Sequence, residues 1–392
     1  MNKNTVTQYA LLKHRFEALM ISTSNANALV GKVVPGVIRY EESEQGYARR
    51  ELLNVERQTI EDKKLKEIND ESYVDRVRNQ FHQVLIQRFD EQIADTHTLY
   101  YDILGLSDSL PELLDMLAIR ASSIARIEPL AARTPWLFDE LLKVVNAPQH
   151  RRRDSRGKVI IVDNLRTALS FINIDNLKML IPALAFRRTI PQVTDPYPQI
   201  KARSWQYSLG VALVASELSE SVGVRQNDAF VLGMLEGLGR NAITRLYFRL
   251  FERVQREELE AAQRDKLRDK HDALTKITPS SNFLHALWSD FADKVVSELI
   301  DHMQFKRVFI TDAARAISQA DDQAEFPLAK LIQQARVYAQ YRVLSAHRLI
   351  STDEGKTMLR FSELPISEIQ TLKMLNIATL PLNMKPEIDD LD

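Results

Sequence analysis

The stretch that most constrains the fold of this chain runs from Asn227 to Ile243 and reads NDAFVLGMLEGLGRNAI. It is apolar at helical spacing, is interrupted at Gly237 and Gly239, and then resumes. Gly233 and Gly237 are four residues apart and therefore share one helical face, where a missing side chain lets a neighbouring helix approach closely. Because the flanking segments also have helical periodicity, the sequence predicts an all-α protein.

Composition excludes several classes of protein. The chain has 392 residues, of which 45% are hydrophobic, so it is long enough for a substantial core and for two or three domains. Its 52 basic and 53 acidic residues nearly balance, which gives no general reason to expect nucleic acid or an anionic membrane as a partner. Cysteine is absent, which excludes disulfides and thiolate chemistry. With neither a signal-peptide pattern nor an apolar run long enough to span a bilayer, we expect a cytoplasmic protein without a membrane segment.

Helix boundaries can be placed at several points. Thr134 before Pro135 is typical of a helix start, because a capping hydroxyl precedes a proline in the first turn. That helix should end before Pro148. Asp163 and Asp175 are the expected N-caps of the two helices that follow. Residues 1 to about 30 should form one helix, whose packing partner the sequence does not reveal.

Three lines of sequence carry a family resemblance. The first is PWLFDELLKVVNAP, with Asn146 and Pro148 in matching places, and the second is RSWQYSLGVALVASEL, with Trp205 and Ser208. The third is the 227–243 stretch. These lines resemble the HDOD family, the HD-related output domains of bacteria, in which the third line ends in a phrase like Gly-Leu-Leu-His-Asp-Ile-Gly-Lys. The resemblance implies an HDOD-like helical domain at about 107–350. A helical N-terminal region with a charged linker would occupy 1–106, and a C-terminal extension with an acidic tail 351–392.

The metal-binding dyad of the HD-type phosphohydrolases is missing from these lines. Glu236 and Gly237 occupy the positions of the His-Asp pair, and Tyr207 stands where the catalytic branch supplies its first histidine. A divalent metal needs several imidazole and carboxylate ligands, and a glycine provides none. We therefore expect Tyr207, Glu236, Gly237 and Arg240 to mark a vestigial pocket with no metal, no cofactor and no catalysis. Glu236 should be a hydrogen-bonded or partly exposed acid at a helix end.

A basic loop, QHRRRDSRGK, is the one local concentration of charge. Guanidinium groups pair well with phosphates, so the loop is a candidate phosphate-binding site. No aromatic residue is interleaved for stacking on bases, and a solvated loop is the simpler interpretation, so nucleic acid is not expected as a partner. The cations of this loop are Arg151, Arg152, Arg153, Arg156 and Lys158.

Three hypotheses of function follow. The resemblance implies a non-catalytic signalling or regulatory module that contacts a protein partner or a small ligand, with the partner and the oligomeric state unspecified. The alternatives are an HD-type metal-dependent phosphohydrolase with a rearranged site, and a nucleic-acid or nucleotide binder that uses the loop at 151–158. Trp136, Trp205 and Trp288 lie in helical patterns, and we expect them in the core rather than at a ligand.

Overall fold

The computed structural model describes residues 3–32, 54–153, 157–319 and 325–384. The predicted all-α class is confirmed for these residues, whose regular secondary structure is helical apart from one pair of two-residue strands, β1 (Arg152–Arg153) and β2 (Val159–Ile160). The first part of the charged linker, up to residue 53, and the acidic tail lie outside the described residues.

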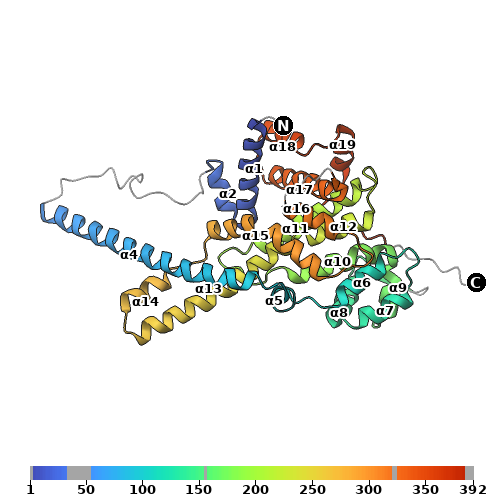
Figure 1. The fold of residues 1–392 in the computed structure, drawn as a ribbon, viewed down its shortest axis with the longest axis horizontal. Coiled ribbons are helices and arrows are strands. Elements are labelled where there is room, and N and C mark those ends of the chain that lie inside the picture. Colours follow the sequence, from blue (N-terminus) through green and yellow to red (C-terminus); the bar gives the residue numbers. More distant parts are fainter. Residues whose placement is uncertain (1–2, 33–53, 154–156, 320–324, 385–392) are drawn as a thin grey trace, which may run out of the picture.

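The N-terminal helices cover the domain that follows them in the sequence. The expected single helix at 1–30 is two helices, α1 (Lys3–Ile21) and α2 (Thr23–Leu29). Helix α1 packs against α11 (Ile200–Leu218), α15 (Ser281–His302), α17 (Pro327–Ala346) and α18 (Thr352–Phe361) (Figure 1). Arg203 of α11 donates a hydrogen bond to the carbonyl of Leu19, and Arg15 of α1 donates one to the carbonyl of Leu349 at 2.6 Å.

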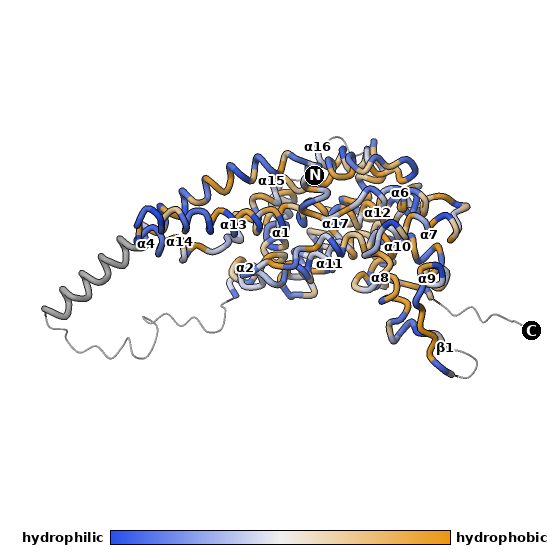
Figure 2. Tube along the Cα trace, turned by 90° about the horizontal axis from the view of Figure 1, so that it is seen from below, coloured by the Kyte–Doolittle hydropathy of each residue, from blue (hydrophilic) through white to orange (hydrophobic). Residues whose placement is uncertain are grey.

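A long arm extends from the body of the molecule. Helix α4 (Asn54–Ile93) lies beside α13 (Leu238–Arg264) and α14 (Arg268–Thr275), and the three project together (Figures 1 and 2). Phe81 of α4 meets Phe251 of α13 edge to face, with ring centroids 5.0 Å apart. After α4 the chain turns through α5 (Thr96–Thr98) and the π-helical turn η2 (Leu99–Ile103).

A cluster of shorter helices forms the opposite end. Asn146 ends one of them and clamps the loop that follows: its side-chain amide donates to the carbonyl of Val162 at 2.7 Å and accepts from the N–H of the same residue at 2.9 Å. The predicted N-caps are wrong by one or two residues, because Asn164 and Asn173, rather than Asp163 and Asp175, accept the capping hydrogen bonds. The helices are α6 (Ser109–Leu117), α7 (Ile124–Ala132), α8 (Pro135–Val145), α9 (Leu165–Ile172) and α10 (Ile174–Thr189).

Helix α11 and helix α12 (Gln226–Leu235) form the centre of the fold, α17 packs beside both of them, and α15 packs mainly against α13 and α16. The remaining elements are α16 (Thr311–Gln319) and α19 (Ile366–Met374). None of the described helices is by itself both long and apolar enough to cross a membrane. Helices α9 and α10 meet at 109° and would satisfy that test only as a bent pair, by length and composition.

Candidate functional site

The four residues of the expected vestigial pocket lie together inside the molecule. Tyr207 projects from α11, Glu236 caps the end of α12, Gly237 begins α13 and Arg240 lies one turn further on. Of the two expected forms of Glu236, a hydrogen-bonded or a partly exposed acid at a helix end, the structure has the first: the residue is hydrogen-bonded and only 2% exposed. We call this set, together with Arg336 and Asp293, the buried centre.

Two guanidinium groups and two carboxylates balance each other in the buried centre. Arg336 of α17 donates from Nε to Glu236 Oε2 at 2.7 Å and from Nη2 to Asp293 Oδ1 at 2.8 Å. Arg240 Nη1 lies 3.7 Å from Glu236 Oε1. Burial alone lowers the pKa of Arg336, but Asp293 and Glu236 outweigh it, so the pKa is raised. Burial raises the pKa of Asp293, but Arg336 outweighs it, and that pKa is lowered.

Tyr207 is enclosed by rings and cations. Arg240 lies over its ring, 5.0 Å from the centroid, and the Phe16 ring of α1 lies 4.8 Å away. The Tyr207 hydroxyl is buried without a hydrogen-bond partner in the described part of the chain. Burial and the nearby Glu236 carboxylate both raise the pKa of Tyr207, so the phenol is neutral at physiological pH. A packed interior therefore occupies this position, and α1 forms one wall of it.

The glycines of the 227–243 stretch are explained by close packing. A Cβ on Gly233 would lie 2.6 Å from the backbone of Ala212 in α11. A Cβ on Gly237 would lie 2.3 Å from Ser208 Oγ and 2.7 Å from the Phe186 ring. No ligand side chain fits at position 237 without displacing this packing. Over residues 3–32, 54–153, 157–319 and 325–384, no group of three or more His, Asp or Glu side chains is arranged to hold a metal ion.

The basic loop is a small hairpin, and two of its arginines donate hydrogen bonds to nearby backbone carbonyls. Strands β1 and β2 pair antiparallel, with Arg152 opposite Ile160. Arg151 Nε donates to the carbonyl of Asn146 at 2.7 Å, and Arg153 Nη1 donates to that of Gly157 at 2.8 Å. Arg156 lies outside the described residues. The hairpin projects from the end of the molecule (Figure 2).

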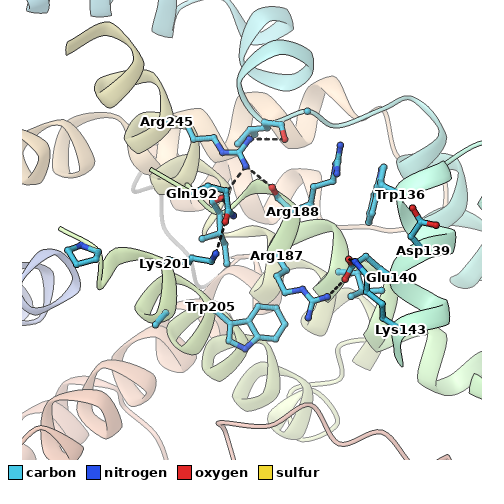
Figure 3. Close-up of a pocket in the computed structure, with 16 residues that line it drawn as sticks. Trp136, Asp139, Glu140, Lys143, Arg187, Arg188, Gln192, Lys201, Trp205 and Arg245 are labelled. Atoms are coloured by element: carbon cyan, nitrogen blue, oxygen red, sulfur yellow. Dashed lines mark hydrogen bonds and ion pairs between the residues drawn. The ribbon is translucent and has the colours of Figure 1, made fainter. Parts of the chain in front are cut away.

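The tryptophan residues divide into two groups. Trp288 is buried, as predicted, and its indole N–H donates to Thr244 Oγ1 at 3.1 Å. Trp136 and Trp205 are only half-buried: they pack against the core and also line an open cleft (Figure 3). Trp205 and Tyr207 are two positions apart, about 200° around a helix, so they point to opposite sides of α11.

A comparison with protein families agrees with the resemblance. The HDOD domain model matches residues 104–281, which include α6 to α14 and the whole lining of the cleft. The match starts close to the expected boundary at 107, while the expected end at 350 stays a prediction. No curated protein and no solved structure matches the chain significantly.

Proposed function

Because residues 104–281 form an HDOD domain, we propose that the chain is a non-catalytic regulatory module of bacterial signal transduction in the cytoplasm. It acts by contact with a protein partner or a small ligand rather than by turning over a substrate. The observation that carries this proposal is the buried centre. The carboxylate in the place of the metal-binding dyad accepts a hydrogen bond from Arg336 and forms a longer ion pair, at 3.7 Å, with Arg240.

The side chains at the buried centre are poor metal ligands, which argues against metal-dependent hydrolysis. A catalytic metal needs several negatively charged or neutral ligands and an open position for water. Here Glu236 has positive neighbours, which would repel a divalent cation, and Gly237 has no ligand atom and no room for one. A phenol kept neutral by burial is a poor ligand for a hard cation. These features argue against the alternative of an HD-type phosphohydrolase with a rearranged site.

Elemental analysis and hydrolysis assays test this proposal. We expect the purified full chain to carry no stoichiometric divalent metal and to hydrolyse neither phosphomonoesters nor phosphodiesters nor cyclic dinucleotides, with or without added manganese or magnesium. The matched variant is Glu236→Gln, which keeps the shape of the side chain but removes its charge. Circular dichroism checks whether this variant folds. One equivalent of metal in the parent that is lost in a folded Glu236→Gln variant would overturn the non-catalytic reading.

A further inference from the structure

An open cleft lies on the far side of α11 from Tyr207. Its walls come from α8, α10, α11 and α13, and its volume is about 990 Å³. This is at the upper end of the range of small-molecule sites in proteins, about 300–1,000 Å³. Two indole rings lie at its sides, Trp136 on α8 and Trp205 on α11 (Figure 3). We call it the tryptophan cleft.

The cleft carries more positive than negative charge. Five cationic side chains and two carboxylates line it. One carboxylate, Glu140, is shared by two cations, since it accepts from Lys143 Nζ at 2.7 Å and also from Arg187. Burial raises the pKa of Glu140, but Lys143 and Arg187 outweigh it, so the acid stays ionised and offsets part of the charge of these two cations. Within the described chain, no ion pair is formed by the other three cations, which are Arg188, Lys201 and Arg245.

These three cations are held in place by neutral groups. Arg245 donates to the carbonyl of Ile103 at 2.7 Å, to that of Arg188 at 2.7 Å and to that of Ile190 at 3.1 Å. Lys201 Nζ donates to Gln192 Oε1 at 2.6 Å. Burial lowers the pKa of Arg245 first, and the nearby Arg188 guanidinium lowers it further, so the two cations repel each other. An anion in the cleft would relieve this repulsion.

The two indole rings differ in what already covers them. The Arg188 guanidinium lies over the Trp136 ring, 5.2 Å from its centroid. Trp205 is half-buried and has neither a ring contact nor a side-chain hydrogen bond to any residue that the structure describes. A half-buried indole without such partners, next to cations that lack a counter-ion, is suited to a ligand that joins a planar ring to a phosphate.

We propose that the tryptophan cleft binds a nucleotide, with its base stacked on Trp205 and its phosphates held by Arg188 and Lys201 in the field of Arg245. The site is separate from the buried centre and from the basic hairpin, none of whose described residues lines the cleft. Binding here requires neither a metal ligand nor a hydrolytic step. The proposal therefore stands or fails independently of the non-catalytic role.

Calorimetric titration of the full chain with GTP and ATP tests the proposal. We expect one molecule to bind per chain at concentrations below about 1 mM, and guanosine, adenosine and inorganic phosphate each to bind at least tenfold more weakly, because each offers only half of the contacts. Lys201→Gln and Arg188→Gln should each weaken binding about tenfold, the size of one charge-assisted hydrogen bond. Trp205→Leu should weaken it by roughly fivefold to a hundredfold through lost stacking.

Lys276→Gln is the matched control, because Lys276 is also exposed but lies at the end of α14 and does not line the cleft. It should bind as the parent does, and thermal melting of each variant checks that it folds. Three results would overturn the proposal: no binding of either nucleotide at about 1 mM, binding that Lys201→Gln and Trp205→Leu leave unchanged, or phosphate alone binding as tightly as the nucleotides. Tighter binding of a single-stranded oligonucleotide or an acidic peptide would replace the nucleotide with a macromolecular ligand and so also overturn it.

Discussion

The buried centre and the tryptophan cleft lie on opposite sides of one helix, α11, and differ in how their charged side chains are paired. Tyr207 faces the centre, where two carboxylates meet two guanidinium groups and only the Asp293 side chain is substantially exposed, at 43%. Trp205 faces the cleft, where Arg188, Lys201 and Arg245 have no carboxylate partner among the described residues. In the centre the protein supplies both signs of charge, and in the cleft it supplies mainly one.

The difference separates what holds the fold from what is free to bind. Charges buried together must neutralise each other, because an unpaired ion in a low-dielectric interior costs several kcal/mol. Charges at an open cleft are solvated, and they cost little until a ligand replaces the water. Substitutions in the two regions should therefore act on different quantities: unfolding free energy in the centre, and ligand affinity in the cleft.

The largest expected effect comes from breaking the ion pair of the buried centre. Arg336→Met leaves Glu236 buried with only Arg240 nearby, at 3.7 Å, and should lower the free energy of unfolding by about 3–5 kcal/mol. Chemical denaturation followed by circular dichroism measures this change. Arg336→Lys keeps a positive charge at the site, so its free energy of unfolding should lie between those of Arg336→Met and the parent. This second variant keeps the test usable if Arg336→Met does not fold.

Two control variants test whether this loss of stability is specific to the buried centre. Arg256→Met removes an exposed ion pair to Glu252 on α13, and Lys201→Gln removes a cation from the cleft. Each should change the free energy of unfolding by no more than about 0.5 kcal/mol. If the free energy of unfolding of Arg336→Met equals that of these controls, the buried centre does not stabilise the fold.

A smaller effect should follow from filling the close approach between α11 and α12. Gly233→Ala places a Cβ 2.6 Å from the Ala212 backbone and should cost about 1–3 kcal/mol of unfolding free energy. Gly210→Ala, on α11, is the matched control, because its Cβ would make an ordinary 3.5 Å contact with Ile377. It should be neutral or stabilise by up to about 1 kcal/mol, since alanine is the better helix former. Equal melting temperatures for the two variants would contradict the close-packing account.

The sequence was sufficient for features that depend on local pattern. Helical periodicity predicted the all-α class. The glycine spacing of the 227–243 stretch predicted a close helix contact, which Gly233 makes with α11. Asn146 also lay in a recognisable line, and its two hydrogen bonds to Val162 explain why an amide serves there. The predicted N-caps of α9 and α10 lie one or two residues from the observed ones, because Asn164 and Asn173 have the same capping chemistry as their acidic neighbours.

What the sequence could not give are the contacts between distant segments. Arg336 lies 100 residues beyond Glu236, and no local pattern connects them. The packing of Phe16 on Tyr207 depends on α1 returning to the domain, so the sequence left that helix without a partner. Trp205 was assigned to the core because helical periodicity does not say which face of a helix meets solvent when both faces carry aromatic residues.

The smallest expected effect concerns the N-terminal wall of the buried centre and is confined to acid solution. Glu17 of α1 is buried and accepts a hydrogen bond from His285 at 2.7 Å, with Lys13 3.9 Å away and Arg240 also nearby. Burial raises the pKa of Glu17, but His285, Lys13 and Arg240 together outweigh it, so the pKa lies below its ordinary value of 4.5. His14 also touches His285, at 3.3 Å.

The direction of the pH effect follows from this lowered pKa. Between the two pKa values the unfolded chain binds a proton that the folded chain does not, so the ionised Glu17 stabilises the fold above about pH 4.5, and this contribution is lost as the pH falls through the lower, folded value. Melting temperatures at pH 7 and at pH values stepped below 4.5 measure it. Glu17→Gln should melt below the parent at pH 7, and the gap should close in acid. A gap that stays constant with pH would show that Glu17 contributes through packing and not through its charge.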